Sequence, residues 1–259
     1  MGYCWIYNFP NCTVEEGLVN MKRIEIQNIQ KEVTGKKIIK SATFDISGGE
    51  ICALIGPNGV GKTTLLKCIL GLICPDQGSI TINNTLLSKS SRPKILKEIG
   101  TVFTIPDSIY NMTISELFNE HFNYLQIEKT KSYSDSLKIL ELEVPITTKI
   151  GKLSFGMKQR LQLAIALSHS PNILILDEPF NGLDMDGINI IKRVLTNLSR
   201  KDKCILIASH SLSELEDFAS SVVFMKKGET HEKKSINDII KEYPGGLREY
   251  YQILKGRES

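Results

Sequence analysis

The features that mark a membrane-spanning, nucleic-acid-binding or disulfide-bonded protein are missing from this sequence. No apolar run approaches the length of a membrane span, so any spanning part must come from another chain. The net charge of +3 is too small to indicate nucleic acid as a partner, and no basic stripe with interleaved aromatics is present. The six cysteines form no framework, because Cys52, Cys68 and Cys204 fall in expected apolar elements; they indicate a reducing cytosol.

The first 20 residues contain no lysine or arginine, which excludes the basic start of a signal peptide. Met1-Gly2 fits a myristoylation signal only in part, because Ile6 stands where serine or threonine is required. The stretch is aromatic instead, with Tyr3, Trp5, Tyr7 and Phe9. We expect residues 1–20 to be a poorly ordered leader or extension, and residues 21–259 to form one domain.

The glycine-rich loop GPNGVGKTT is the most informative stretch of the chain. It fits G-x-x-x-x-G-K-[ST], in which the backbone N–H groups point at phosphates, the lysine reaches the β- and γ-phosphates and the threonine ligates Mg²⁺. A buried strand at 51–55 and a helix with apolar residues at 65, 66, 69 and 70 flank the loop, which argues against a chance turn. The sequence therefore predicts binding of a nucleoside triphosphate by Gly56, Pro57, Asn58, Gly59, Val60, Gly61, Lys62, Thr63 and Thr64.

Two carboxylates, Asp177 and Glu178, follow a second apolar strand at 173–176. Because open α/β sheets bind ligands at the carboxyl ends of their strands, both are expected at the nucleotide. One carboxylate can hold the hydration shell of Mg²⁺ while the next positions and deprotonates the attacking water. The alternative is an acidic pair that caps the following helix, and the phosphate loop disfavours it.

The strand pattern predicts an α/β protein with a P-loop NTPase core. Near-continuous apolar runs at 204–209 and 222–225 are typical of parallel strands that are covered on both faces. Short alternating strands at 23–29 and 38–46, before the phosphate loop, predict an N-terminal antiparallel β subdomain, and 79–83 is expected to be a further strand.

Helical spacing predicts a second subdomain, inserted between core strands over about 105–165. Apolar residues recur with helical spacing over 114–125 and 134–142, and Thr113 with Glu116 supplies cap chemistry. After Gly228 the chain becomes polar, which predicts two short helices broken at Pro244-Gly245-Gly246.

The stretch LSFGM opens another expected helix, which runs on to about residue 167. Ser154, the close-packing Gly156 and the free N–H groups at a helix start together make a second anion site. A serine in this place by itself is usually only an N-cap.

Five motifs in order make the chain resemble the nucleotide-binding subunits of ABC transporters, from about residue 22 to the end. They are GPNGVGKT like the Walker A loop, LSFGM like the signature, ILILDEP like Walker B, FNGLD like the D-loop and ILIASH like the switch-histidine strand. The pattern IG…P…IYNMTISEL resembles the branch that serves ABC-2-type exporters, including bacitracin and lantibiotic self-protection pumps. The resemblance implies ATP and Mg²⁺ as ligands.

The resemblance also implies a role for each site residue. Glu178 would be the general base, Asp177 the Mg²⁺-side carboxylate, and Lys62 the cation on the phosphates. His210 would contact the γ-phosphate; the alternative is a strand-end histidine bonded to backbone. The remaining histidines considered, His121, His169 and His231, receive no role.

In this family two nucleotide-binding domains pair head to tail, and each ATP lies between the Walker loop of one and the signature helix of the other. Ser154 and Gly156 would therefore serve the nucleotide of the other domain, and Asp184 would link the two sites. The second domain is either another copy of this chain or a close paralogue.

Three positions depart from the family pattern. Thr104 stands where most members have a glutamine that helps to hold Mg²⁺, and its shorter side chain puts the metal coupling in doubt. Val33 stands where the family stacks an aromatic on adenine, a loss of about 1 kcal/mol of base binding. Phe155 replaces a signature glycine, which we expect to be tolerated because Ser154 and Gly156 remain.

The function that the resemblance implies is an ATPase subunit of an exporter, held at the cytoplasmic face of the membrane by a separate permease. The cargo would be a peptide antibiotic or another small amphipathic compound. One alternative is a non-transport ABC ATPase of repair, iron–sulfur assembly or translation; the chain has no room for long coiled coils and carries one Walker A motif. Another is a regulatory subunit that binds ATP and hydrolyses it slowly.

Residues 104–116 are the expected dock for the permease, because they mix loop residues with the apolar Ile109, Tyr110 and Met112. The alternative is that these three side chains fold inward and pack against the inserted helices.

Overall fold

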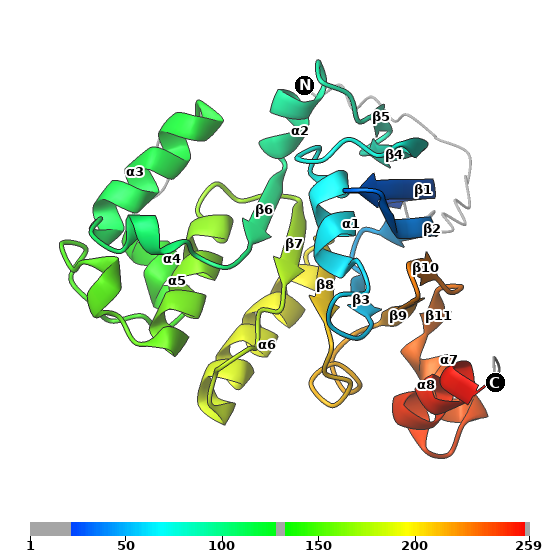
Figure 1. The fold of residues 1–259 in the computed structure, drawn as a ribbon. Coiled ribbons are helices and arrows are strands. Elements are labelled where there is room, and N and C mark those ends of the chain that lie inside the picture. The colour runs from blue at the N-terminus through cyan, green and yellow to red at the C-terminus, as the bar shows by residue number, and fades with distance from the viewer. Residues whose placement is uncertain (1–21, 128–132, 257–259) are drawn as a thin grey trace, which may run out of the picture.

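The computed structural model describes residues 22–127 and 133–256, so the expected leader at residues 1–20 lies outside the described part. A mixed sheet runs through it in the order β5-β4-β1-β2-β10-β9-β3-β8-β7-β6, and β11 pairs with β9 (Figure 1). The strands are β1 (Lys22–Val33), β2 (Lys36–Ser47), β3 (Ile51–Ile55), β4 (Gln77–Ile82), β5 (Thr85–Leu86), β6 (Ile99–Val102), β7 (Ile173–Asp177), β8 (Cys204–Ser209), β9 (Ser221–Lys226), β10 (Glu229–Thr230) and β11 (Lys234–Ser235).

The strands β9, β3, β8, β7 and β6 form the expected parallel core. Every residue of β3 is buried, and its side chains alternate between two apolar clusters. Ala53 and Ile55 join the cluster on one face, whereas Cys52 and Leu54 join the cluster on the other. The prediction of parallel strands covered on both faces is confirmed.

The antiparallel subdomain is also confirmed, but its first two strands are longer than expected. β1 and β2 form one hairpin of two 12-residue strands, and β4 pairs with the other edge of β1. The register shifts between Ile26 and Ile29, and Asn28 between them has a φ of 46°. This irregularity returns Ile29 to the buried face, which explains the break in the alternating sequence pattern.

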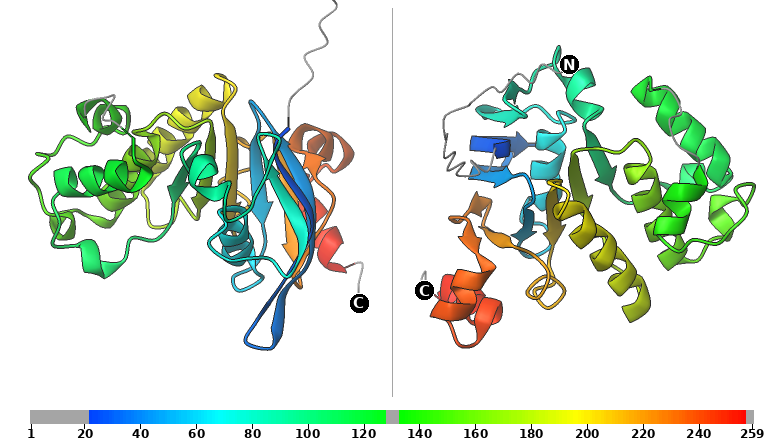
Figure 2. Two further views of the ribbon diagram at one scale, coloured as in Figure 1. Left: turned by 90° about the horizontal axis from the view of Figure 1, so that it is seen from above. Right: turned by 180° about the vertical axis from the view of Figure 1, so that it is seen from behind.

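The helices cover the sheet on both sides and extend beyond one end of it (Figure 2). α3, α4 and α5 lie between β6 and β7 in the chain and stand at the end of the molecule away from the antiparallel strands (Figure 1). Among the described residues no helix has the length and apolar character to cross a membrane. The helices are α1 (Lys62–Ile69), α2 (Arg92–Leu96), α3 (Ile114–Leu125), α4 (Tyr133–Ile139), α5 (Phe155–Leu167), α6 (Met185–Ser199), α7 (Ile236–Glu242) and α8 (Gly246–Gly256).

The helix boundaries have local causes. The Thr113 hydroxyl accepts the Glu116 N–H and the Glu116 carboxylate accepts the Thr113 N–H, which is the expected capping box at the start of α3. α4 ends at Ile139, earlier than expected, although Leu142 beyond it is still buried. The break between α7 and α8 falls in the predicted glycine–proline stretch.

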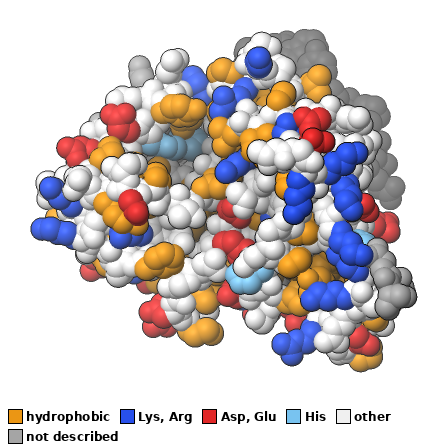
Figure 3. Space-filling view, viewed as in Figure 1, with side chains coloured by type: hydrophobic (Ala, Val, Ile, Leu, Met, Phe, Trp, Pro, Cys, Tyr) orange, Lys and Arg blue, Asp and Glu red, His pale blue; other side chains and the backbone are white. Residues whose placement is uncertain are grey.

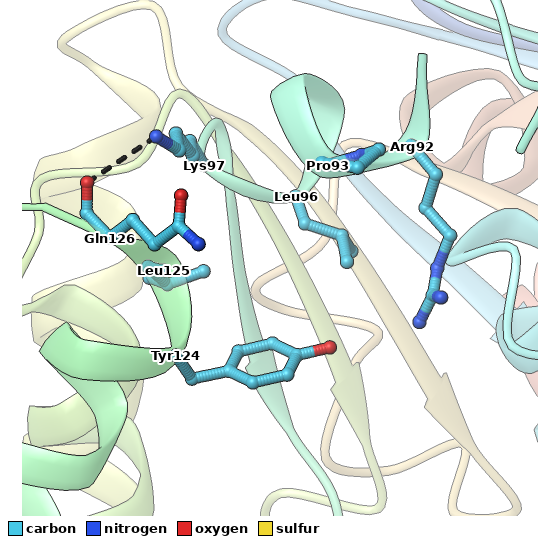
Figure 4. A pocket seen from close by; sticks show the side chains of 7 residues that line it. All are labelled: Arg92, Pro93, Leu96, Lys97, Tyr124, Leu125 and Gln126. Atoms are coloured by element: carbon cyan, nitrogen blue, oxygen red, sulfur yellow. Dashed lines mark hydrogen bonds between the residues drawn. The ribbon is translucent and has the colours of Figure 1, made fainter. Parts of the chain in front are cut away.

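One polar contact between the inserted helices and the core is a pair of histidines. His121 on α3 and His169 before β7 lie side by side and partly buried, with Nε2 of His121 3.0 Å from Nδ1 of His169. Burial, and less strongly the charge of His169, lower the pKa of His121 to about 4. Beyond it a cavity of about 220 Å³ separates α2 from the end of α3, and Lys97 donates to the Gln126 carbonyl across it (Figure 4).

The expected docking stretch, residues 104–116, exposes its apolar side chains only in part. Pro106, Asp107 and Ser108 are exposed, but Ile109, Tyr110 and Met112 are partly buried and pack against the main core cluster. Lys158 of α5 places its ammonium 4.0 Å from the centre of the Tyr110 ring. The structure therefore favours the alternative, in which these three side chains pack inward, and the docking role of residues 104–116 stays a prediction.

Tyr110→Ala should accordingly lower the stability of the isolated subunit. The lost packing and the lost cation–π contact together predict about 2 kcal/mol, or a fall in melting temperature of roughly 4–8 °C. Differential scanning fluorimetry measures this directly, with Tyr124→Ala as the exposed-ring control. An unchanged melting temperature in Tyr110→Ala would contradict a stabilising, packed role for the Tyr110 ring.

Candidate active site

The phosphate loop lies between β3 and α1, and steric limits fix its outer glycines. A Cβ on Gly56 would lie 2.4 Å from the Met225 carbonyl oxygen. Gly61 has a φ of 115°, and a Cβ there would lie 3.1 Å from the Ile38 carbonyl oxygen. Both positions therefore require glycine, and their backbone brings the chain round so that α1 begins at Lys62.

Lys62 is only 6% exposed, and its ammonium lies inside the curve of the loop. Nζ donates to the Gly56 carbonyl at 2.6 Å and lies 3.5 Å from Oε1 of Glu178. The cation assigned to the phosphates thus stands directly beside the expected general base. The sequence pattern placed both residues at the nucleotide, but it gave no sign that they touch.

The Thr63 hydroxyl donates to Oδ2 of Asp177 at 2.7 Å, which joins the loop to the end of β7. The other carboxylate oxygen of Asp177, Oδ1, is buried without a hydrogen-bond partner among the described residues. Burial raises the pKa of Asp177 and so does the nearby charge of Glu178, whereas the bond from Thr63 opposes the shift. Asp177 is therefore a partly buried carboxylate with one oxygen that has no hydrogen-bond partner among the described residues, which favours a cation beside it.

Glu178 follows in a left-handed conformation, with a φ of 50°, and its N–H donates to the Ala208 carbonyl. Its Oε2 lies 2.9 Å from Nδ1 of His210, at the end of the adjacent strand β8. The bend turns Glu178 away from the strand line, so that its two oxygens face Lys62 and His210. Such strained backbone is tolerated where the surrounding structure holds it.

Lys62, Thr63, Asp177 and Glu178 share one pocket of about 470 Å³, whose lining does not include His210. Its wall contains most of the predicted phosphate loop, together with Thr104 and Val33, and includes two residues to which sequence reasoning gave no individual role, Ile38 and Asn181. The complete lining is Val33, Ile38, Asn58, Gly59, Gly61, Lys62, Thr63, Thr64, Thr104, Asp177, Glu178 and Asn181. Of the predicted loop, Gly56, Pro57 and Val60 lie outside the lining.

Positive charge gathers on this side of the molecule. Lysine and arginine side chains line the right-hand part of the face in Figure 3, over the antiparallel strands. Lys36 and Lys37 are exposed in β2 directly before Ile38, which lines the pocket. These exposed lysines would favour the approach of an anionic triphosphate, although the net charge of the chain is small.

The signature and D-loop residues lie elsewhere. Ser154 caps α5, where its hydroxyl accepts the Met157 N–H at 3.2 Å. Asp184 caps α6 by accepting the Gly187 N–H at 2.9 Å. Neither these residues nor Gly156 line the pocket of this chain. The sequence motif thus supplies the predicted helix start, but within one chain that start does not reach the phosphate loop.

Glu214 is a further carboxylate near the site, and no sequence signal marked it. Burial raises its pKa, the charge of His210 lowers it, and the charge of Glu178 raises it. Glu214 therefore lies in the electrostatic surroundings of the Glu178–His210 pair.

Asp177→Asn should stabilise the protein without ligand and remove its response to Mg²⁺. Because the pKa of Asp177 is raised above 3.8 in the folded state, the stability that its protonated form provides is lost as pH rises through that raised value. At neutral pH the amide removes a buried charge, so we expect the melting temperature to rise by a few degrees. Melting curves from pH 7 down toward pH 4 should show this difference shrinking; an equal or lower melting temperature at pH 7 would contradict the argument.

The similarities to known proteins agree with this geometry. The ABC transporter family matches residues 39–181. The bacitracin transport ATP-binding protein BcrA of Bacillus licheniformis is 35% identical over 217 residues, which cover 83% of this chain and 69% of BcrA. The lantibiotic transport ATP-binding protein SrtF of Streptococcus pyogenes is 33% identical over 79% of this chain and 87% of its own length.

Among solved structures, an ATP-binding subunit of an ABC transporter superposes with a TM-score of 0.81 at 27% identity, over 90% of this chain and 99% of that one. The expected α/β fold, with its P-loop core, antiparallel subdomain and inserted helices, is confirmed by this likeness. The chain therefore belongs to the ABC transporter family, as one of its ATP-binding, ATP-hydrolysing subunits.

Proposed function

We propose that this chain hydrolyses Mg²⁺-ATP to power the export of a small amphipathic cargo, of which a peptide antibiotic is the best example. The observation that carries the proposal is the single pocket in which Lys62, Thr63, Asp177 and Glu178 meet. A cation for the phosphates, a hydroxyl and a carboxylate for the metal, and a second carboxylate for the water are the parts that phosphoryl transfer to water requires.

Thr63 and Asp177 are the residues that would hold Mg²⁺. Their oxygens are the hard donors that this ion prefers, and Oδ1 of Asp177 has no competing hydrogen bond among the described residues. Mg²⁺ usually takes only one or two protein carboxylates beside substrate phosphates, which fits so small a donor set. The ion would neutralise charge on the β- and γ-phosphates. Thr104 lines the same pocket and would contribute through water, because its side chain is short.

Glu178 would take a proton from the attacking water, and His210 would orient the Glu178 carboxylate. The distance of 2.9 Å from Nδ1 of His210 to Oε2 fits a hydrogen bond that holds the carboxylate in place. A neutral imidazole has one N–H, so it can donate either to Glu178 or to a γ-phosphate, whereas a protonated ring can donate to both.

Ser154, Gly156 and Asp184 would act on a second nucleotide-binding domain, either another copy of this chain or a close paralogue. Their place outside the pocket of their own chain supports this assignment. The free N–H groups at the start of α5 can receive a phosphate that another domain presents, since a helix N-terminus attracts anions.

The remaining partner is a separate integral membrane permease, which would hold this subunit at the cytoplasmic face of the membrane. The names of BcrA and SrtF support a peptide-antibiotic cargo, and no nucleic acid enters the proposal. Affinity purification of the tagged chain from detergent extracts tests the assignment. We expect an integral membrane protein to co-purify with the chain, to dissociate at high detergent concentration, and no nucleic acid to co-purify. Recovery of the chain without any membrane protein would contradict the assignment of a permease partner.

A further inference from the structure

Phe155, the residue in place of a signature glycine, packs against the turn that follows the catalytic carboxylates. Gly182 in that turn has a φ of +68°, and a Cβ on it would lie 2.5 Å from Cε1 and 2.7 Å from Cδ1 of the Phe155 ring. The ring therefore rests directly on the backbone of Gly182. Its other side is open, because Phe155 is 57% exposed.

A second contact joins the same two segments, and here the turn contributes the large side chain and α5 contributes the glycine. Leu183 of the turn lies over Gly156 of α5, where an added Cβ would come within 3.2 Å of Cδ2. The same methyl group lies 3.2 Å from the Cβ position of Gly187 on α6. Each segment thus offers one large side chain and one glycine, so that Phe155 covers Gly182 while Leu183 covers Gly156.

The turn connects Glu178, in the nucleotide site of this chain, to Asp184, which is assigned to the site of the second domain. It begins at Glu178, ends at Asp184 on the N-terminus of α6, and is fixed to the core by the buried Phe180. Phe155 also borders a small cavity of about 110 Å³ whose wall includes Glu178 and Asn181. The Phe155 ring therefore lies between the start of α5 and the turn that follows Glu178.

We propose that Phe155 is a positioning residue that couples the signature helix of this chain to its own Glu178. The inference rests on the proposed function, in which the start of α5 engages the nucleotide of a second domain. Engagement there would move Phe155, and Phe155 would set Gly182 and hence Glu178 in the hydrolytic geometry. The ring takes no part in the chemistry, since its role is to carry position from one site to the other.

Phe155→Ala should lower turnover by roughly tenfold, because misplacement of a catalytic group by about 1 Å can cost up to 10²-fold. The KM for ATP should change less than about twofold, since the phosphate loop is untouched, and loss of a half-exposed ring should move the melting temperature by only about 1–2 °C. The cooperativity of ATP hydrolysis should also fall, because the two nucleotide sites would no longer be coupled through Phe155. Phe155→Tyr keeps the ring and should restore turnover and cooperativity.

A double-mutant cycle with Gly182→Ala tests the contact itself. In the wild-type background the new methyl group meets the ring, so the variant should lose turnover; in the Phe155→Ala background the steric part of that loss should disappear. Tyr124→Ala, which removes an exposed ring on α3, serves as the control and should behave as wild type.

Wild-type turnover in Phe155→Ala would overturn the proposal. Independent effects of Phe155→Ala and Gly182→Ala, whose fold-changes in turnover multiply in the double variant, would also overturn it. So would a fall in the melting temperature of Phe155→Ala that is large enough to explain the lost activity. If Gly182→Ala fails to fold, the turnover of Phe155→Ala and its rescue by tyrosine decide the question. Absence of ATP hydrolysis in the wild type and in Tyr124→Ala alike would contradict the proposed function instead.

Discussion

Lys62→Ala is expected to abolish ATP binding. Lys62 is the cation within the loop, and its ammonium is held in place by the Gly56 carbonyl. Without it, the backbone N–H groups would have to hold a triphosphate alone, although charge-assisted bonds are about twice as strong as neutral ones. Removal of the lysine also leaves Glu178 without the ammonium that lies 3.5 Å from its Oε1, so that an anionic carboxylate would face the phosphates.

Titration with a fluorescent ATP analogue measures this effect. Lys94→Ala is the matched control, because Lys94 is an exposed lysine on α2 that lies outside the pocket lining. The control should bind as wild type does. Unchanged affinity in Lys62→Ala would remove the loop from the nucleotide site.

Glu178→Gln is expected to slow hydrolysis by roughly 10²–10⁴-fold and to leave ATP binding intact. A positioned general base contributes a factor of this size, and the amide keeps the shape while losing the basic oxygen. Because the contacts of Lys62 and Thr63 to the nucleotide persist, the variant should accumulate with ATP bound and elute as a dimer on a sizing column.

Steady-state phosphate release compares the variants. Glu214→Gln is the control, since Glu214 lies within the electrostatic reach of both Glu178 and His210 and has no assigned part in the reaction. It should retain most of the wild-type rate. Hydrolysis at a near wild-type rate in Glu178→Gln would take Glu178 out of the mechanism.

Local sequence patterns predicted the fold and most of the pocket because their causes are local. The loop glycines and the apolar β3 determine where Lys62 and Thr63 lie, and the end of β7 determines where Asp177 and Glu178 lie. Parallel pairing of β3 with β8 and of β8 with β7 then brings these strand ends together. The fold class followed from such runs, as did the antiparallel hairpin and the inserted helices.

The interactions between those segments could not be predicted in the same way. The contact of Lys62 with Glu178 and that of Phe155 with Gly182 depend on side-chain directions across long sequence separations. The partial burial of Ile109, Tyr110 and Met112 could not be predicted for a similar reason, because a mixed loop composition does not reveal how its apolar side chains pack. The roles of Ser154, Gly156 and Asp184 depend on a second domain and remain predictions.

A single-turnover measurement tests most directly whether this site hydrolyses ATP or only senses it. ATP is bound to the purified chain without metal, Mg²⁺ is added, and the bound nucleotide is extracted at intervals and separated. The account predicts that the wild type converts its bound ATP to ADP and phosphate, whereas Glu178→Gln retains ATP over the same period. Wild-type protein that keeps its ATP after Mg²⁺ is added, as the Glu178→Gln variant does, would contradict the account and identify a nucleotide-gated regulatory subunit.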